Sequence, residues 1–234
     1  MRSPVYTVGW LGPGRYNSGV SAVGVFHLAP SLSPIVRPAV IWWTSASVVE
    51  HAAALDQLLA EAEAALRAQP PQETAAVRTM YKRVGLDPTK TRPSSEALLR
   101  RILKGGGVPR INAMVDVINW CSVEFQLPYG LYDRSRMRGE PTLRLGAEGE
   151  EYAGIRKDTV HVAGRITVAD DEGPFGNPTS DSTRTMVTTA TTEALVVVYA
   201  PAGTAQDRLA CVLDRTAERL ERICGGQEEG RWLA

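Results

Sequence analysis

Three polar side chains stand beside the apolar face of one predicted helix. Asn112, Asp116 and Asn119 follow the spacing i, i+4 and i+7, which places them on one side of a helix over residues 111–125. A buried amide or carboxylate is costly unless it is hydrogen-bonded. These side chains therefore either bond to neighbouring backbone or line a wet cavity where they meet a ligand. The spacing by itself favours the structural role.

A polar loop over residues 176–185 is the second candidate for chemistry. Its sequence, GNPTSDSTRT, is dense in hydroxyl groups and holds one carboxylate, Asp181, and one guanidinium, Arg184. Loops between strands often carry binding and catalytic residues. The loop is either a substrate-binding element or a polar surface turn, and its composition by itself favours the surface turn.

Several kinds of active site are disfavoured by the motifs that the chain lacks. The three histidines, His27, His51 and His161, are far apart and have no ligand spacing, so we expect no metal site and no cofactor. The glycine clusters at 12–14 and 105–107 lack the lysine and hydroxyl pair of a P-loop, and no G-x-S-x-G motif of a serine hydrolase occurs.

Charge is uneven although the formal net charge of the whole chain is zero. Residues 81–110 contain eight lysines and arginines against two acidic residues, a net charge of +6, whereas residues 140–172 carry a net charge of −4. Clustered positive charge can bind phosphate groups through salt-dependent contacts. Solvated helix faces explain the same composition equally well.

The elements that must position these groups are a mixture of strands and helices. Strands are predicted over 21–29, 39–43, 141–145, 158–164, 165–169 and 194–200, and residues 127–133 are interpreted as a turn. Helices are predicted over 48–67, 73–84, 93–104, 111–125 and 205–224. Because strands and helices do not alternate regularly, we expect an α+β fold with a mainly antiparallel sheet flanked by helices.

Composition predicts an ordinary globular protein, with 44% hydrophobic and 22% charged residues. No linker-like shift divides the chain, so a single domain is predicted over 1–225, with 226–234 as a loose tail. No apolar run is long enough for a transmembrane helix, the N-terminus has no signal-peptide block, and no membrane partner is expected. Three cysteines without a C-x-x-C pair predict a cytoplasmic location.

Three segments, in this order along the chain, resemble a known family. They are YKRVGLDPTKTRPSSEALLRRILKGGGVPRINAMVDVINWCSVEFQLPYGLYD, LRLGAEGEEYAGI and DDEGPFGNPTSDSTRTMVTTATTEALVVVYA. Together they resemble the B3/B4 domain of the β subunit of bacterial phenylalanyl-tRNA synthetase, a domain that also occurs as free-standing proteins. The resemblance is clearest over residues 78–200 and implies a B3/B4-like fold. In the synthetase, this domain hydrolyses the ester of tRNA that carries the wrong amino acid.

The family's functional residues carry over in part. Asn119 matches an asparagine within the family's helix, whereas Ile118 stands where the synthetase has threonine. The synthetase's Pro-x-His-x-x-Asp turn corresponds to residues 128–133, where Gly130 replaces the histidine, as is common in free-standing members. Asp181 is the carboxylate nearest to the position of the family's acidic editing residue and is assigned by hypothesis. The missing side chain at Gly130 is expected to enlarge the pocket.

The resemblance implies a free-standing, trans-editing aminoacyl-tRNA deacylase that acts on the aminoacylated 3′ end of mischarged tRNA. Such chemistry needs neither a protein nucleophile nor a metal, because the ester is already reactive. The alternative is a non-catalytic module of the same fold that binds tRNA or an amino acid, which the missing histidine favours. The residues assigned under the first hypothesis are Asn119 and Asp181 as catalytic; Asn112, Gly130, Thr179, Ser180, Ser182 and Arg184 as pocket residues; and Arg92, Arg100, Arg101 and Lys104 as tRNA-binding.

Overall fold

The centre of the fold is a four-stranded sheet with the order β10–β2–β9–β3, in which every neighbouring pair is antiparallel. The computed structural model describes residues 24–71, 74–155 and 157–234. The inner strands β2 and β9 are buried along nearly their whole length, as their continuous apolar sequences predict. The strands of this sheet are β2 (Val36–Thr44), β3 (Tyr129–Asp133), β9 (Ala194–Pro201) and β10 (Gln227–Leu233).

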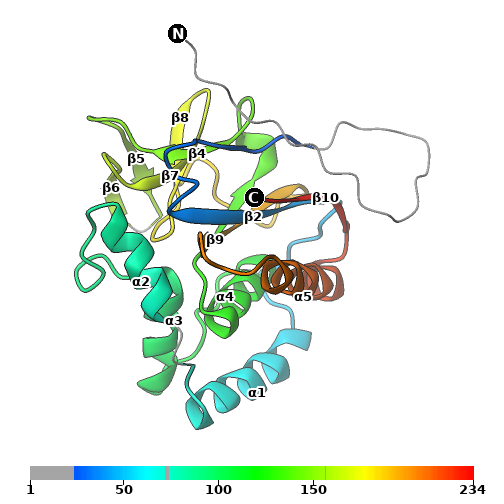
Figure 1. Cartoon of the computed structure of the whole chain (residues 1–234). Helices are drawn as coiled ribbons and strands as arrows, with labels where there is room; N and C mark the ends of the chain where they lie inside the picture. The colour runs from blue at the N-terminus through cyan, green and yellow to red at the C-terminus, as the bar shows by residue number, and fades with distance from the viewer. Residues whose placement is uncertain (1–23, 72–73, 156) are drawn as a thin grey trace.

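Helices cover one face of the central sheet. Figure 1 shows α4 and α5 against this face, with α1 and α3 packed outside α4. Most of α4 is buried, because it lies between the sheet and its neighbouring helices. The helices of the described ranges are α1 (Ala54–Ala68), α2 (Thr74–Arg83), α3 (Ser94–Leu103), α4 (Ala113–Phe125) and α5 (Gln206–Cys224). None of them is long and apolar enough to cross a membrane.

A second four-stranded sheet, with the order β1–β4–β7–β8, lies on the other side of the central sheet (Figure 1). Its pairs are antiparallel except for β1 with β4. Apolar side chains of the helices and of both four-stranded sheets form one core. The remaining elements are β1 (His27–Leu28), a short 3-10 helix (Arg134–Arg136), β4 (Thr142–Leu145), β5 (Glu151–Gly154), β6 (Lys157–His161), β7 (Ile166–Asp170) and β8 (Gly173–Gly176), with β5 and β6 paired as a hairpin.

The predicted α+β class with mainly antiparallel pairing is confirmed, although two four-stranded sheets stand in place of one. The three helices predicted over 93–104, 111–125 and 205–224 match α3, α4 and α5 closely. The helix predicted from Val48 begins instead at Ala54. The strand predicted over 21–29 is reduced to β1, because residues 24–26 are not in a strand, and residues 21–23 lie outside the described ranges.

Two predictions about the backbone are wrong. The loose tail predicted over 226–234 is strand β10, which pairs with β2 from Gln227 to Leu233. The turn predicted over 127–133 contains strand β3, which pairs with β9 and is buried at all five residues. In both segments the local sequence signals a chain end or a turn. Both segments nevertheless form strands, because pairing with a neighbouring strand satisfies backbone N–H and C=O groups that would otherwise be buried without partners.

Candidate functional site

A cavity of about 470 Å³ lies between α3, α4, β3 and the loop that follows β8. Its volume is in the range of small-molecule binding sites. Ile118, Asn119 and Ser122 of α4 form one side of it, since residues three and four apart share a helical face. Ser94 of α3 and Asp181 of the loop face the same space. We call it the acidic cavity, because Asp181 is the one charged side chain among the described residues that line it.

Three residues of this wall have side-chain atoms without a hydrogen-bond partner in the part of the chain that the structure describes. The Asp181 Oδ1 atom and the Ser94 hydroxyl are buried and make no hydrogen bond within the described ranges. The amide of half-buried Asn119 likewise forms no hydrogen bond to any residue that the structure describes. Buried polar groups are normally satisfied, so unsatisfied ones on residues that line a cavity indicate a place for a polar ligand or water.

Burial raises the pKa of Asp181 from 3.8 to about 7. The nearby Tyr132 hydroxyl and the Leu131 backbone N–H lower this pKa, but they do not offset the loss of water. Burial, followed by the nearby Asp181 carboxyl, holds the pKa of Tyr132 well above its usual value, so the phenol stays a neutral donor. A carboxyl group that titrates near neutral pH can accept a proton from water or return one.

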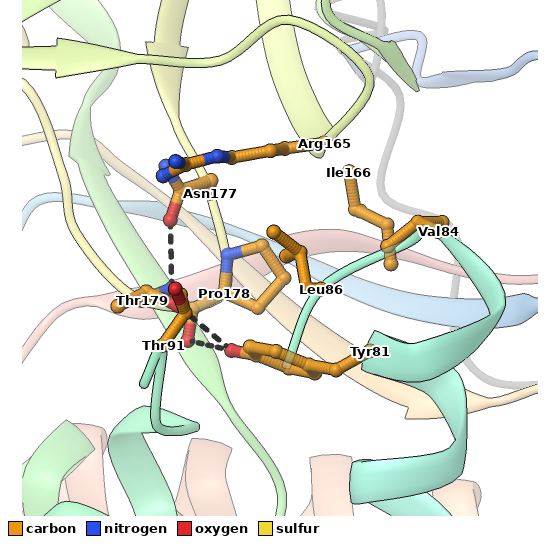
Figure 2. A pocket seen from close by; sticks show the side chains of 9 residues that line it. All are labelled: Tyr81, Val84, Leu86, Thr91, Arg165, Ile166, Asn177, Pro178 and Thr179. Atoms are coloured by element: carbon orange, nitrogen blue, oxygen red, sulfur yellow. Dashed lines mark hydrogen bonds between the residues drawn. The ribbon is translucent and has the colours of Figure 1, made fainter. Parts of the chain in front are cut away.

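The loop that carries Asp181 is held by side-chain hydrogen bonds. Asn177 accepts from the backbone N–H groups of Thr179 at 2.8 Å and of Ser180 at 2.9 Å, and its amide donates to the Tyr152 hydroxyl at 2.8 Å. The Tyr81 hydroxyl lies 2.9 Å from the Thr179 hydroxyl, as Figure 2 shows. Thr179 and Ser180, both predicted as pocket residues, do line the acidic cavity. These hydrogen bonds therefore hold this side of the acidic cavity in one conformation.

Gly130 does not line the acidic cavity, and the predicted enlargement of the pocket at this position is corrected. A Cβ atom on Gly130 would lie 2.1 Å from the Tyr132 hydroxyl, and one on Gly176 would lie 2.2 Å from the same atom. Tyr132 is fully buried, and its hydroxyl is 2.6 Å from that of Tyr199. The glycine is present because the end of the Tyr132 ring occupies the space that a side chain would need.

Asn112 caps helix α4 and does not line the acidic cavity, contrary to its prediction as a pocket residue. Its Oδ1 atom accepts from the Val115 N–H at 3.0 Å, which satisfies one of the free N–H groups at the helix start. Asp116 is also structural, since its carboxylate accepts from the Ile111 N–H at 2.8 Å and from Arg110 Nε at 2.7 Å. Of the three polar residues of this helix, Asn119 alone faces the acidic cavity.

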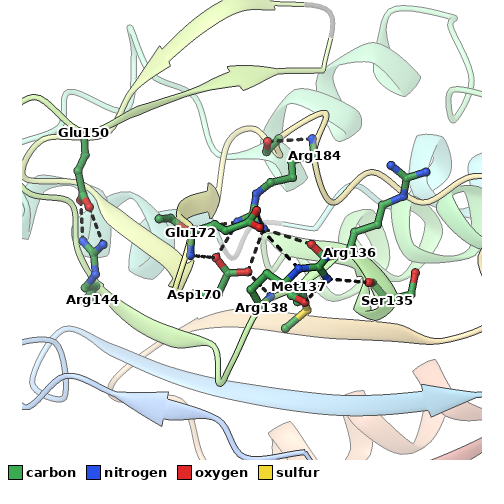
Figure 3. A network of polar contacts seen from close by, with 11 residues as sticks. Ser135, Arg136, Met137, Arg138, Arg144, Glu150, Asp170, Glu172 and Arg184 are labelled. Atoms are coloured by element: carbon green, nitrogen blue, oxygen red, sulfur yellow. Dashed lines mark hydrogen bonds and ion pairs between the residues drawn. The ribbon is translucent and has the colours of Figure 1, made fainter.

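Ser182 and Arg184 also lie outside the wall of the acidic cavity. The Ser182 hydroxyl accepts from the backbone N–H of Arg184 at 3.1 Å. The Arg184 guanidinium donates to both carboxylate oxygens of Asp170, at 2.8 and 2.9 Å, and is 3.2 Å from Glu172, as Figure 3 shows. The Asp170 carboxylate is fully buried. The Ser182 side chain therefore bonds within the loop, and Arg184 anchors the end of the loop to β7.

We expect the substitution Arg184→Met to lower the free energy of unfolding by about 2–4 kcal/mol, because it leaves the buried Asp170 carboxylate without its ion-pair partner. Urea unfolding followed by circular dichroism measures this. Arg138→Met is the matched control, since the Arg138–Glu172 pair is 3.6 Å long and exposed, and its loss costs about 0–1 kcal/mol. Equal losses in the two variants would contradict the structural role of Arg184.

The predicted tRNA-binding residues are not all in one place. Arg92 lines a second cavity beside the acidic one. Arg100, Arg101 and Lys104 are exposed on or just after α3 and line neither cavity. The Arg101 guanidinium is also engaged, since its Nε donates to the Gly107 carbonyl at 2.7 Å. Contact of these three residues with RNA stays a prediction.

Sequence reasoning missed Ser94 as a member of the site. The sequence predicts it only as part of a helix start, and it lines the acidic cavity because α3 packs against α4. No local signal distinguishes it from Ser95. Within the described ranges, no group of three or more His, Cys, Asp or Glu residues is arranged to hold a metal ion.

Comparison with known proteins relates this chain to a family. A family model for the B3/4 domain matches residues 76–225. The phenylalanine–tRNA ligase beta subunit of Streptomyces avermitilis is 33% identical over 94 residues, which cover 39% of this chain and 11% of the relative. The beta subunit of Brucella abortus is 30% identical over 86 residues, which cover 36% of this chain and 11% of the relative. The matches thus span about a tenth of the length of these relatives.

A crystal structure was also found to be similar. It is an N-terminal fragment of the phenylalanyl-tRNA synthetase beta subunit from Pyrococcus horikoshii, with 15% sequence identity and a TM-score of 0.45. The similarity covers 93% of this chain and 53% of the fragment.

Proposed function

The chain belongs to the B3/4 domain family, and on that premise we propose that it is a cytoplasmic aminoacyl-tRNA deacylase acting in trans on mischarged tRNA. Its curated relatives are phenylalanine–tRNA ligase beta subunits, which relates the chain to the tRNA synthetases. Hydrolysis, tRNA as substrate and the roles of Asn119 and Asp181 are parts of the proposal. They rest on the chemistry of the acidic cavity.

The charge of the acidic cavity gives the main support for this proposal. Asp181 supplies a carboxyl group, and no lysine, arginine or histidine lines the wall among the described residues. A free amino acid brings an ammonium and a carboxylate, and burying that carboxylate beside Asp181 without a cation is unfavourable. In an aminoacyl ester the carboxylate is masked and the ammonium remains. The cavity therefore favours an aminoacyl ester over the free amino acid.

The polar groups of the wall suit ester hydrolysis by water. Ionised Asp181 takes a proton from a water molecule as the water oxygen bonds to the ester carbon. The Asn119 amide or the Ser94 hydroxyl donates a hydrogen bond to the carbonyl oxygen as it gains negative charge. The C–O bond to the ribose then breaks, and the proton held by Asp181 passes to the departing ribose oxygen. The products are the free amino acid and the uncharged tRNA.

Selectivity for the amino acid would come from the apolar part of the wall. Leu98, Val115 and Ile118 line the cavity together with the polar groups. An apolar wall of this kind distinguishes side chains by size, with about 10- to 200-fold discrimination for a methylene group. A panel of charged tRNAs incubated with the protein tests the proposal, and we expect ester loss on a subset of its members.

We expect Asn119→Ala to lower the rate constant of single-turnover deacylation by about 10²–10³-fold, the usual effect of removing one oxyanion donor. The dissociation constant for the charged tRNA should change little, because the donor acts mainly on the developing charge. Rapid-quench measurement of ester loss separates the rate constant from binding. The control is Gln57→Ala, which removes an exposed amide that bonds to Glu61 on α1.

The non-catalytic alternative makes the opposite forecast. A binding module of the same fold would leave every ester intact, and Asn119→Ala would then alter the dissociation constant without a rate to change. The two functions are therefore separated by whether wild-type protein accelerates ester loss over the uncatalysed reaction.

A further inference from the structure

A second, strongly basic cavity of about 250 Å³ adjoins the acidic cavity. Lys90, Arg92 and Arg165 line it, and no acidic residue does so among the residues that the structure describes. We call it the basic cavity. Figure 2 shows the Arg165 side chain extended over Asn177, which belongs to the walls of both cavities.

The positive charges of the basic cavity are only partly compensated by neighbouring acids, among them Asp87 near Lys90. The side chains of Lys90 and Arg165 make no hydrogen bond or ion pair within the described ranges. Arg92 Nε lies 3.3 Å from Glu96, but both carboxylate oxygens of Glu96 already accept from Arg78, at 2.6 and 2.8 Å. Three cations around one concave space, with little compensation, produce a positive potential that favours an anion.

The two cavities share lining residues, and side-chain hydrogen bonds hold these residues in place. Asn177, Thr179 and Ser180 line both cavities. The backbone N–H groups of Thr179 and Ser180 are engaged by Asn177, so they are not free to bind an anion. The attraction for an anion therefore comes from the side chains of Lys90, Arg92 and Arg165. One ligand with a cation at one end and an anion at the other matches the two cavities together.

We propose that the basic cavity binds the 5′-phosphate of the terminal nucleotide of the RNA whose aminoacyl ester occupies the acidic cavity. The inference rests on the proposed function, since an aminoacyl-nucleotide has an ammonium and a phosphate separated by one ribose. It assigns phosphate binding to Lys90 and Arg165, with Arg92 adding positive charge beside them. The two opposite charges also set the direction in which the RNA end enters the site.

The test uses two stable ligands, 3′-deoxy-3′-(L-alanylamino)adenosine with and without a 5′-phosphate. The amide replaces the ester, so no turnover is needed. Isothermal titration with the full chain is expected to give an affinity about tenfold or more higher for the phosphorylated ligand, because charge-assisted hydrogen bonds are added. This advantage should shrink as salt is raised.

The variant Lys90→Gln/Arg165→Gln should reduce the advantage of the phosphorylated ligand to about twofold or less, if both charges bind phosphate. The matched control is Arg222→Gln, which removes an exposed arginine on α5 and should keep the full advantage. Unfolding midpoints of the variants verify the fold. Equal affinity for the two ligands in wild-type protein, binding of neither ligand, or an undiminished advantage in the double variant would overturn the proposal.

The outcome is independent of deacylation. The protein could prefer the phosphorylated ligand through Lys90 and Arg165 and still leave every ester of charged tRNA intact. That result would support the phosphate site and contradict the deacylase activity. A protein that hydrolyses esters but shows no phosphate preference would refute the phosphate site alone.

Discussion

Replacement of Asp181 by asparagine is expected to lower kcat/KM for a charged tRNA by about 10²–10⁴-fold, the contribution of a positioned general base. The wild-type rate, corrected for uncatalysed hydrolysis, should rise with pH up to about 7 and then level off, because the carboxyl loses its proton near that pH. The residual rate of the variant should show no such inflection. A wild-type profile that is flat between pH 5 and 8 would contradict the role of Asp181 as a base.

The same substitution is expected to stabilise the folded protein above pH 7. The pKa of Asp181 is about 7 in the folded state and 3.8 when exposed, so the folded protein binds more protons between these values. The stabilising effect of the protonated carboxyl is fully present below pH 4 and is lost as pH rises through 7. Asp181→Asn should therefore raise the free energy of unfolding at pH 8 by about 2–4 kcal/mol, with little change at pH 4.

Urea unfolding at both pH values checks this expectation, with Asp171→Asn as the matched control. Asp171 is exposed, and its replacement should change the stability by about 0.5 kcal/mol or less at either pH. If Asp181→Asn lowers the free energy of unfolding at pH 8, the ionised carboxylate stabilises the fold, which contradicts the expectation that its burial destabilises the protein.

Gly130→Ala is expected to destabilise the protein, although Gly130 does not line the acidic cavity. The new Cβ would lie 2.1 Å from the Tyr132 hydroxyl and 2.6 Å from Cζ of the same ring, too close for any real contact. The ring cannot move freely, because it is fully buried and packs edge-on against Phe175 with 4.9 Å between centroids. Thermal and urea unfolding should show a loss of about 2–3 kcal/mol, as for overpacked cores.

A double-mutant cycle identifies the cause of that loss. Tyr132→Leu removes the ring that meets the new Cβ, so the loss in Gly130→Ala/Tyr132→Leu should be smaller than the sum of the two single losses by about 1 kcal/mol or more. Gly203→Ala is the control, since nothing lies within 4 Å of a Cβ at Gly203. Additive losses in the cycle would show that Tyr132 is not the reason for glycine at position 130.

The helices could be predicted from the sequence because their apolar residues recur at helical spacing. The segments that became α3, α4 and α5 also have clear ends, such as the glycines at 105–107 and 225–226. Strands β3 and β10 could not be predicted, because their sequences contain turn residues or charges. Their structure depends on pairing with β9 and β2, which lie far away in the chain.

The site was predictable in its segments but not in its side-chain directions. The sequence indicates both helix 111–125 and loop 176–185. Asn119, which the resemblance implies, and Asp181, which is assigned by hypothesis, line the same cavity. Two other polar residues of the same segments, Asn112 and Ser182, bond to nearby backbone instead. Which polar groups face the ligand depends on helix rotation and on local hydrogen bonds, and composition does not encode either.

Ester loss from a panel of charged tRNAs directly measures the proposed deacylase activity. Each tRNA is incubated with wild-type protein, with Asp181→Asn protein and without protein, and the remaining aminoacyl-tRNA is followed over time. We expect wild-type protein to accelerate ester loss on a subset of the panel, and the Asp181→Asn protein to approach the uncatalysed rate on that subset. If wild-type protein leaves every tRNA at its uncatalysed rate, the protein is not a deacylase. If the variant accelerates ester loss as much as wild-type protein does, Asp181 is not the general base.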